Sequence, residues 1–199
     1  MLESIDESLE AFFRATVPLG ATDVDVSFDP PDREWTATLT RPTVNIFLWD
    51  VRRSLNKARA GRRTVARDGP TFYEVPPPFL ELRYVVTTWA GDRHQERALL
   101  SGVIRSLLSN GVIGRDHLGP AFDDVEVPSL TMAAAGDDRI DVSAVLDGQL
   151  KPGLNMVLTT EFDLGVRHPA GPLVGSLEGT FGRFGSDTTG SIRQVRSES

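Results

Sequence analysis

The side chains that most often carry catalysis, histidines and paired carboxylates, are widely dispersed in this sequence. His94, His117 and His168 lie far apart, and none has a second ligand or a base at motif spacing. His94 falls in the first turn of a predicted helix, so we expect it to face solvent. Adjacent aspartates occur at 123–124 and 137–138, where neighbouring carboxylates in loops are usually just solvated. We therefore predict no catalytic residue, no metal ligand and no cofactor.

Two glycine-containing segments also lack the residue spacing of the phosphate-binding or nucleophile motif that each partly resembles. Residues 179–185 contain three glycines, but their spacing differs from a phosphate loop and no strand is expected before them. Residues 175–179 do not match the G-x-S-x-G elbow of hydrolases. The chain has no cysteine, which excludes disulfides, thiol nucleophiles and cysteine-bound metals. The sequence predicts a protein that is not an enzyme.

The strongest chemical signal is a basic segment that contains no acidic residue. Residues 52–67 hold seven of the 21 lysines and arginines, although the net charge is −7. Prolines and a glycine at 69–70 and 76–78 predict a long loop or loose hairpin over 52–78. Three interpretations stay open, namely a solvated loop, contact with an acidic protein surface, and contact with nucleic acid. The net charge argues against a general nucleic-acid binder, so we expect no nucleic acid. The predicted partner-binding residues are Arg52, Arg53, Lys57, Arg59, Arg62, Arg63 and Arg67.

The length and hydropathy predict one soluble domain. A chain of 199 residues buries a sizeable core without disulfides. No apolar run approaches the roughly 18–20 residues that span a bilayer. The first residues are acidic, whereas a signal peptide begins with positive charge. We expect no membrane span and a cytoplasmic location.

Hydrophobic periodicity predicts the elements that surround the basic segment. A mixed sheet of about five to six strands with one long and two shorter helices makes an α+β fold. We expect this domain over 1–163, followed by a flexible tail at 164–199 that is rich in Gly, Ser and Arg. The strand at 44–51 is apolar on both faces, which is typical of a covered, central strand. The helices are predicted at 5–15, 92–110 and 141–148, and the strands at 24–28, 35–40, 44–51, 79–89, 125–132 and 154–162.

Several separated runs resemble one known family in the right order. They are VDVSFDPP at 24–31, RPTVNIFLWDVR at 41–52 and LRYVVTTWA at 82–90, together with LLSGVIRSLL at 99–108 and LKPGLN at 150–155. The chain is similar here to the N-terminal domain of the tail-terminator (cap) proteins of phage-tail-like contractile injection systems, of the antifeeding-prophage and virulence-cassette type. The family more often has tyrosine where Trp49 stands. The resemblance covers roughly 1–163.

The resemblance implies a structural cap that forms a homo-hexameric ring at the end of the tube and sheath. It would end polymerisation, anchor the last sheath ring, and have sheath and inner-tube proteins as partners within a particle assembled in the cytoplasm. Such proteins accept strands at an exposed sheet edge. The expected edge is the strand carrying Leu154, Met156, Leu158 and Thr160, or the strand at 125–132. The alternative is a stand-alone α/β ligand-binding module or small enzyme.

Overall fold

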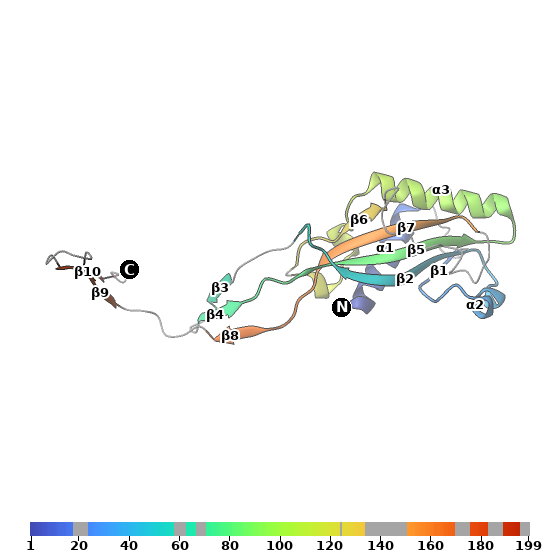
Figure 1. The fold of residues 1–199 in the computed structure, drawn as a ribbon. Coiled ribbons are helices and arrows are strands. Elements are labelled where there is room, and N and C mark those ends of the chain that lie inside the picture. The colour runs from blue at the N-terminus through green and yellow to red at the C-terminus, as the bar shows by residue number, and fades with distance from the viewer. Residues whose placement is uncertain are drawn as a thin grey trace. The chain divides into compact units, whose positions relative to one another are not determined.

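The computed structural model describes residues 1–17, 24–57, 63–66, 71–123, 125–133, 151–169, 176–182 and 189–195 (Figure 1). The chain divides into two compact units. Unit 1 comprises residues 1–60 and 76–165, and unit 2 comprises residues 61–75 and 166–199. Each unit is therefore built from two stretches of the sequence.

Unit 1 is built on a mixed five-stranded sheet with the order β1-β2-β5-β7-β6. β1 runs parallel to β2, and the remaining neighbours are antiparallel. Together with the three α-helices of the described residues, this sheet confirms the predicted α+β class. The strands are β1 (Asp25–Ser27), β2 (Thr43–Arg53), β5 (Phe79–Trp89), β6 (Ser129–Met132) and β7 (Gly153–Glu161).

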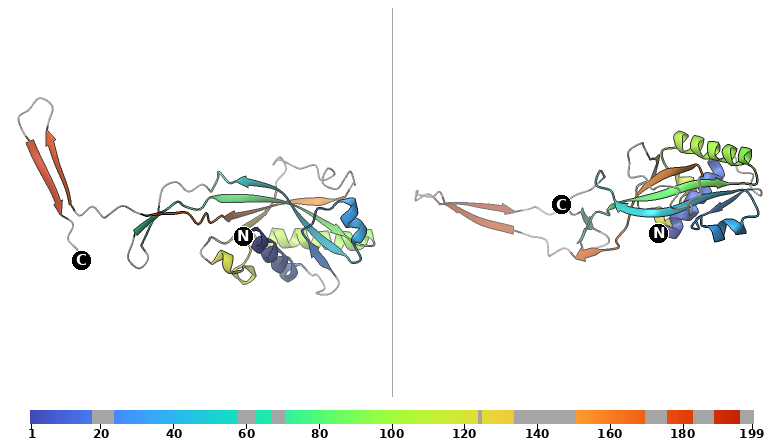
Figure 2. Two further views of the ribbon diagram at one scale, coloured as in Figure 1. Left: turned by 90° about the horizontal axis from the view of Figure 1, so that it is seen from below. Right: turned by 45° about the vertical axis from the view of Figure 1, so that its right-hand side comes forward.

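Two helices, α1 (Leu2–Thr16) and α3 (Arg93–Ser109), lie on the same face of this sheet (Figure 2). The apolar stripe of each helix faces the strands, as the helical period requires. Alternate residues of β2, β5 and β7 complete the core from the sheet side. The principal buried residues are Ile5, Leu9, Phe12, Phe13, Val44, Ile46, Leu82, Tyr84, Val86, Leu99, Val103, Leu107, Met156 and Leu158.

The start of α3 is fixed by the side chain of its N-cap residue, Asp92. An Asp92 carboxylate oxygen accepts hydrogen bonds from the backbone N–H groups of His94 and Gln95, at 2.8 and 2.9 Å. These bonds satisfy two donors that have no partner inside the helix. The predicted main helix is confirmed.

The strand predicted to be covered on both faces is covered only in its first half. Residues 43–46 of β2 are buried, 47–50 are half-buried, and 51–53 are exposed. The register shifts near the middle, because Leu48 lies opposite Tyr84 while Asp50 lies opposite Arg83. Trp49 is therefore the extra residue of a β-bulge, and bulges bend and twist a strand locally. β2 is also second in the sheet rather than central.

The predicted strand at 35–40 is wrong, because this segment forms the short helix α2 (Arg33–Thr38). Asp32 caps it by accepting from the backbone N–H of Trp35 at 2.7 Å. The hydroxyls of Thr36 and Thr38 donate back to backbone carbonyls three residues earlier. Threonine alternating with apolar residues imitated a strand pattern, whereas its hydroxyls bond locally here.

In the described residues of unit 2, all the regular elements are strands. β3 (Arg63–Ala66), β4 (Thr71–Glu74) and β8 (Arg167–Pro169) form one antiparallel sheet, and β9 (Ser176–Gly182) pairs with β10 (Thr189–Val195). A hairpin was one predicted form of the basic segment. Three strands, β8, β9 and β10, lie within the segment 164–199 that was predicted to be a flexible tail. Whether that segment orders only on a partner stays a prediction. The helix predicted at 141–148 lies outside the described residues.

Candidate functional site

The histidines do not converge on one site. His94 is exposed in the first turn of α3, as predicted. His117 lies in the 3-10 helix η1 (Arg115–His117), with its ring edge-on to Phe12, and His168 lies in β8. Among the described residues, no three His, Asp or Glu side chains are grouped as metal ligands. In the same residues, no helix is long and apolar enough to cross a membrane.

The predicted partner-binding residues are distributed over both units. Arg52 and Arg53 are exposed at the end of β2, where Arg52 is paired with Asp50. Lys57 pairs with Glu126 at 3.2 Å, and its ammonium lies 5.2 Å from the Phe79 ring centroid. Arg63 opens β3 in unit 2. Arg59, Arg62 and Arg67 lie outside the described residues. The partner-binding role of the whole set stays a prediction.

The sheet edge predicted on the last core strand is wrong. β7 lies between β5 and β6, so Leu154, Met156, Leu158 and Thr160 belong to an interior strand. The other candidate, the strand at 125–132, supplies β6 at the edge. Its outer side is already bonded, because the Leu130 N–H donates to the Gly111 carbonyl and the Ile113 N–H donates to the Pro128 carbonyl. A partner strand would have to displace these bonds.

The opposite edge offers a longer stretch of open backbone. β1 pairs with β2 only at residues 43–45. No strand of the described part of the chain pairs with the outer side of β2 from Ile46 to Arg53. Val51, near the end of this stretch, is 47% exposed. Unpaired strand edges readily accept another strand, so the outer edge of β2 is the acceptor that the described fold presents.

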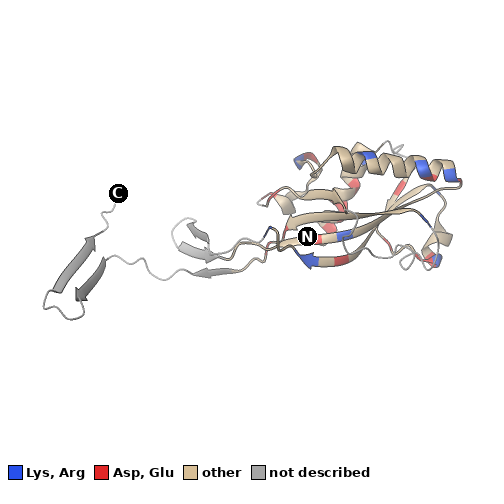
Figure 3. Cartoon of the chain, turned by 45° about the horizontal axis from the view of Figure 1, so that its top comes forward, with Lys and Arg blue, Asp and Glu red and all other residues tan. Residues whose placement is uncertain are grey.

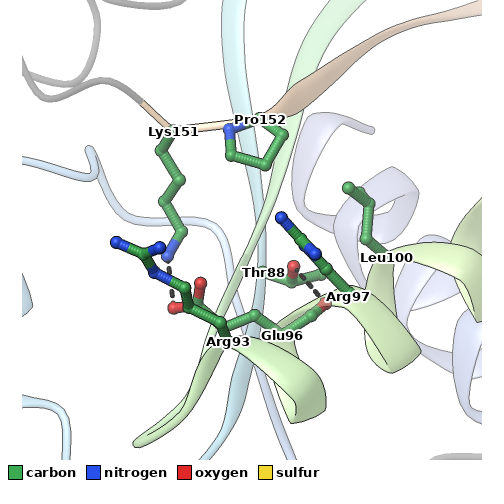
Figure 4. Close-up of a pocket in the computed structure, with 7 residues that line it drawn as sticks. All are labelled: Thr88, Arg93, Glu96, Arg97, Leu100, Lys151 and Pro152. Atoms are coloured by element: carbon green, nitrogen blue, oxygen red, sulfur yellow. Dashed lines mark hydrogen bonds and ion pairs between the residues drawn. The ribbon is translucent and has the colours of Figure 1, made fainter.

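A cavity of about 300 Å³ lies where α3 begins beside the ends of β5 and β7 (Figure 4). Three cationic side chains line it, from Arg93, Arg97 and Lys151. Lys151 forms an ion pair with Glu96, whose carboxylate also accepts from the Ala90 N–H at 3.3 Å. Leu100, Pro152 and Thr88 complete the lining. The basic side chains thus exceed the acidic ones in this cavity.

The position of Lys151 is fixed by an aromatic ring as well as by its ion pair. Its ammonium lies 4.0 Å from the centroid of the Trp89 ring, a favourable cation–π distance. Trp89 packs edge-on against Trp35 at 5.7 Å and donates its indole N–H to the Thr87 hydroxyl. The indole ring of Trp89 is therefore held on several sides and provides a rigid support for Lys151.

One pair of titratable groups, Asp6 of α1 and Tyr84 of β5, lies outside the lining of this cavity. Burial raises the pKa of the Asp6 carboxyl above its usual value. Burial, and then the Asp6 charge, raise the pKa of the Tyr84 hydroxyl. Both shifts come mainly from desolvation, which disfavours the charged form. They mark a cost of packing α1 on the sheet.

The sequence predicted neither this cavity nor the open outer edge of β2. Arg93 and Arg97 are four residues apart on a helix, which places them on one face, but Lys151 comes from a distant segment. The outer edge of β2 depends on strand order, which the periodicity of a single strand does not reveal. Of these features, only the four-residue spacing of Arg93 and Arg97 could have been recognised in the sequence.

The geometry defines an α+β domain with a helix-covered mixed sheet and no metal-ligand cluster in its described part. The chain belongs to the family described as the Pvc16 N-terminal domain, which it matches over residues 4–173. No curated protein matches the chain.

Two solved structures share the fold along the full length of this chain. The first is the sheath/tube terminator of PVC, an extracellular contractile injection system, in the extended state, with a TM-score of 0.60 and 17% identity. The second is the tube-terminating cap of the anti-feeding prophage (AFP), with a TM-score of 0.58 and 16% identity. Both alignments cover 100% of this chain, but only 65% and 60% of those chains.

Proposed function

We propose that this chain is part of a structural cap that terminates the tail of a contractile injection system. The observation that carries the proposal is its family membership, together with a fold shared over its whole length with a sheath/tube terminator and a tube-terminating cap. The stand-alone ligand-binding module or enzyme has no such support. The proposed partners are the sheath and inner-tube proteins, and the proposed assembly is a homo-hexameric ring.

The proposed cap ends polymerisation of tube and sheath and anchors the last sheath ring, in a particle assembled in the cytoplasm. A terminator must engage the last subunits while offering no equivalent surface onward. Strand addition meets this requirement, because main-chain hydrogen bonds provide affinity at one edge. The outer edge of β2, from Ile46 to Arg53, is the proposed acceptor, since β7 is interior and the outer side of β6 is bonded to 111–113.

The basic residues provide a second, electrostatic contribution. Arg52 and Arg53 lie at the end of the proposed acceptor edge and are exposed. Arginine forms planar, two-pronged bonds with carboxylates. An acidic tube or sheath surface beside the added strand would therefore be attracted to this end of β2. Nucleic acid is not a proposed partner, because the net charge is −7.

Deleting the coding sequence in the producing cell tests the function. We expect electron micrographs to show sheath–tube assemblies of uncontrolled length or with detached terminal sheath. Re-expression of the intact chain in the same cells is the matched control and should restore a narrow length distribution. Particles of normal length and normal sheath attachment after deletion would refute the proposal.

A further inference from the structure

Two of the cationic side chains in the cavity at the start of α3 lie where the local electrostatics disfavour positive charge. Arg93 is the first residue of α3, where the helix dipole favours negative rather than positive charge. Arg97 lies one turn later on the same face, and two like charges at this spacing repel each other. Figure 3 shows blue basic segments at this end of α3. A bound anion would offset both costs.

The two guanidinium groups are the unused donors of this cavity. Glu96, the acidic residue of its lining, is already engaged by Lys151 and by the Ala90 N–H. Within the described residues, neither Arg93 nor Arg97 forms an ion pair. In Figure 4 both side chains project on the same side of α3 as Lys151. Together they offer more donors than one carboxylate can satisfy.

The shape and lining of the cavity favour a peptide over a small free ion. Its volume of about 300 Å³ exceeds that of one liquid water, about 30 Å³, roughly tenfold. Leu100 and Pro152 present apolar surface beside the cations. A side chain with methylene groups and a terminal carboxylate matches both the apolar wall and the guanidinium donors.

We propose that this cavity binds a glutamate or aspartate side chain carried on an acidic peptide segment of a partner protein. The proposal rests on the proposed function in taking that partner to be a neighbouring subunit of the particle. The bound carboxylate lies between the guanidinium groups of Arg93 and Arg97, and the neighbouring residues of the segment pack on Leu100 and Pro152. Lys151 keeps its pairing with Glu96 and so compensates the acidic residue of the lining.

The binding test uses the intact chain and two matched probe peptides. The first is acetyl-Glu-Leu-Glu-amide, and the second is acetyl-Gln-Leu-Gln-amide, which has the same shape without charge. Calorimetry measures affinity, and the intrinsic tryptophan fluorescence, to which Trp89 beside Lys151 contributes, provides a second readout. We expect saturable binding of the acidic peptide, at least about tenfold tighter than the neutral one, because charge-assisted hydrogen bonds are the stronger kind. Inorganic phosphate should bind more weakly than the acidic peptide.

Arg97→Gln should weaken binding of the acidic peptide about tenfold or more, whereas Arg105→Gln should leave it unchanged. Arg105 is exposed on the same helix but does not line the cavity, so it controls for the loss of one charge. Because Arg97→Gln also relieves the repulsion from Arg93, thermal unfolding should show no loss of stability. Absence of saturable binding, equal binding of the two peptides, equal losses in the two variants, or tighter binding of phosphate would overturn the proposal.

The two proposals fail in different experiments. If the acidic peptide does not bind while the deletion strain makes particles of aberrant length, the cavity proposal fails and the cap function stands. If the peptide binds selectively while the deletion strain makes normal particles, the carboxylate site stands and its assignment to a particle subunit fails.

Discussion

The two units of this chain differ in both charge and architecture. Unit 2 carries seven of the 21 basic residues but only five of the 28 acidic ones, so the negative net charge belongs to unit 1. Unit 1 has a five-stranded sheet with two helices over one face, whereas the described part of unit 2 has short strands only. A two-stranded hairpin such as β9–β10 is marginally stable at best when isolated in water. We infer that unit 1 carries most of the stability of the fold, whereas ordering of unit 2 on a partner stays a prediction.

Truncating the core of unit 1 should have the largest effect on stability. Phe12 of α1 is 1% exposed. Its ring packs edge-on against Phe13 of the same helix and against His117 of η1. Phe12→Ala should lower the free energy of unfolding by about 3–5 kcal/mol, because it removes buried area and leaves a cavity. Urea unfolding followed by tryptophan fluorescence measures the change.

Leu2→Ala provides the matched control on the same helix. Leu2 is 45% exposed, and surface substitutions usually change stability by less than about 0.5 kcal/mol. A loss for Phe12→Ala as small as that for Leu2→Ala would contradict the assignment of stability to the α1–sheet interface.

The open edge of unit 1 can be blocked while its own hydrogen bonds are kept. The Ser54 N–H donates to the Phe79 carbonyl, so by strand alternation the backbone groups of Arg52 also face β5 and those of Val51 face outward. Val51→Pro therefore removes an outward donor without breaking the β2–β5 ladder, and proline is tolerated at strand edges. We expect sheath attachment in the assembled particle to be lost.

Val51→Thr separates backbone from side-chain effects at this position. Threonine keeps the branched shape and the N–H donor, so attached sheath should appear in micrographs as for the unchanged protein. Normal sheath attachment with Val51→Pro, in a protein that remains folded by circular dichroism, would exclude this edge as the acceptor.

Charge reversal in the basic segment, which runs across the boundary between the two units at residues 60 and 61, tests its role in partner binding. Changing Arg59, Arg62 and Arg63 together to glutamate should weaken binding to isolated sheath–tube particles and leave the unfolding of unit 1 nearly unchanged. The effect should diminish as salt is added, because exposed charges are screened. Co-sedimentation with the particles provides the measurement.

Reversing Arg33 and Arg105 in unit 1 controls for added negative charge. Arg33 opens α2, and Arg105 lies on the exposed side of α3. We expect this pair of changes to weaken particle binding much less than the triple change. Equal weakening would mean that total charge, rather than the basic segment, governs the interaction.

Local periodicity predicted most of unit 1 correctly. The helical spacing of Ile5, Leu9 and Phe12 and the cap at Asp92 placed α1 and α3, and alternation placed β5 and β7. These signals work because burial repeats with the period of each element. The segment that became α2 was mistaken for a strand, since bonds from the Thr36 and Thr38 hydroxyls to backbone carbonyls are invisible to a hydrophobic pattern.

The candidate surfaces were harder to predict because they depend on which segments become neighbours. Leu154 and Met156 alternate like an edge strand, yet β6 covers the outer side of β7. The cavity joins Lys151 to the first turns of α3, which lie over fifty residues earlier in the sequence. Strand order and long-range side-chain contacts are decided by packing of the whole sheet, so single-segment patterns contain no information about them.

The smallest expected effect concerns the cost of partly burying the Asp6 carboxyl group of α1. Because burial raises the pKa of Asp6, the folded state holds this proton more tightly than the unfolded state. The Asp6 contribution to stability is therefore highest at acid pH and declines as pH rises from the usual aspartate range through the raised pKa. Asp6→Asn removes this decline and should slightly raise the melting temperature at pH 7. At pH 3, where the carboxyl is largely protonated, the two proteins should melt alike.

Glu3→Gln, an equal charge change at an exposed site of the same helix, should instead lower stability slightly, because acidic residues in a first turn favour the helix. A fall in the melting temperature for Asp6→Asn at pH 7 would show that the carboxylate makes a favourable contact that outweighs its desolvation.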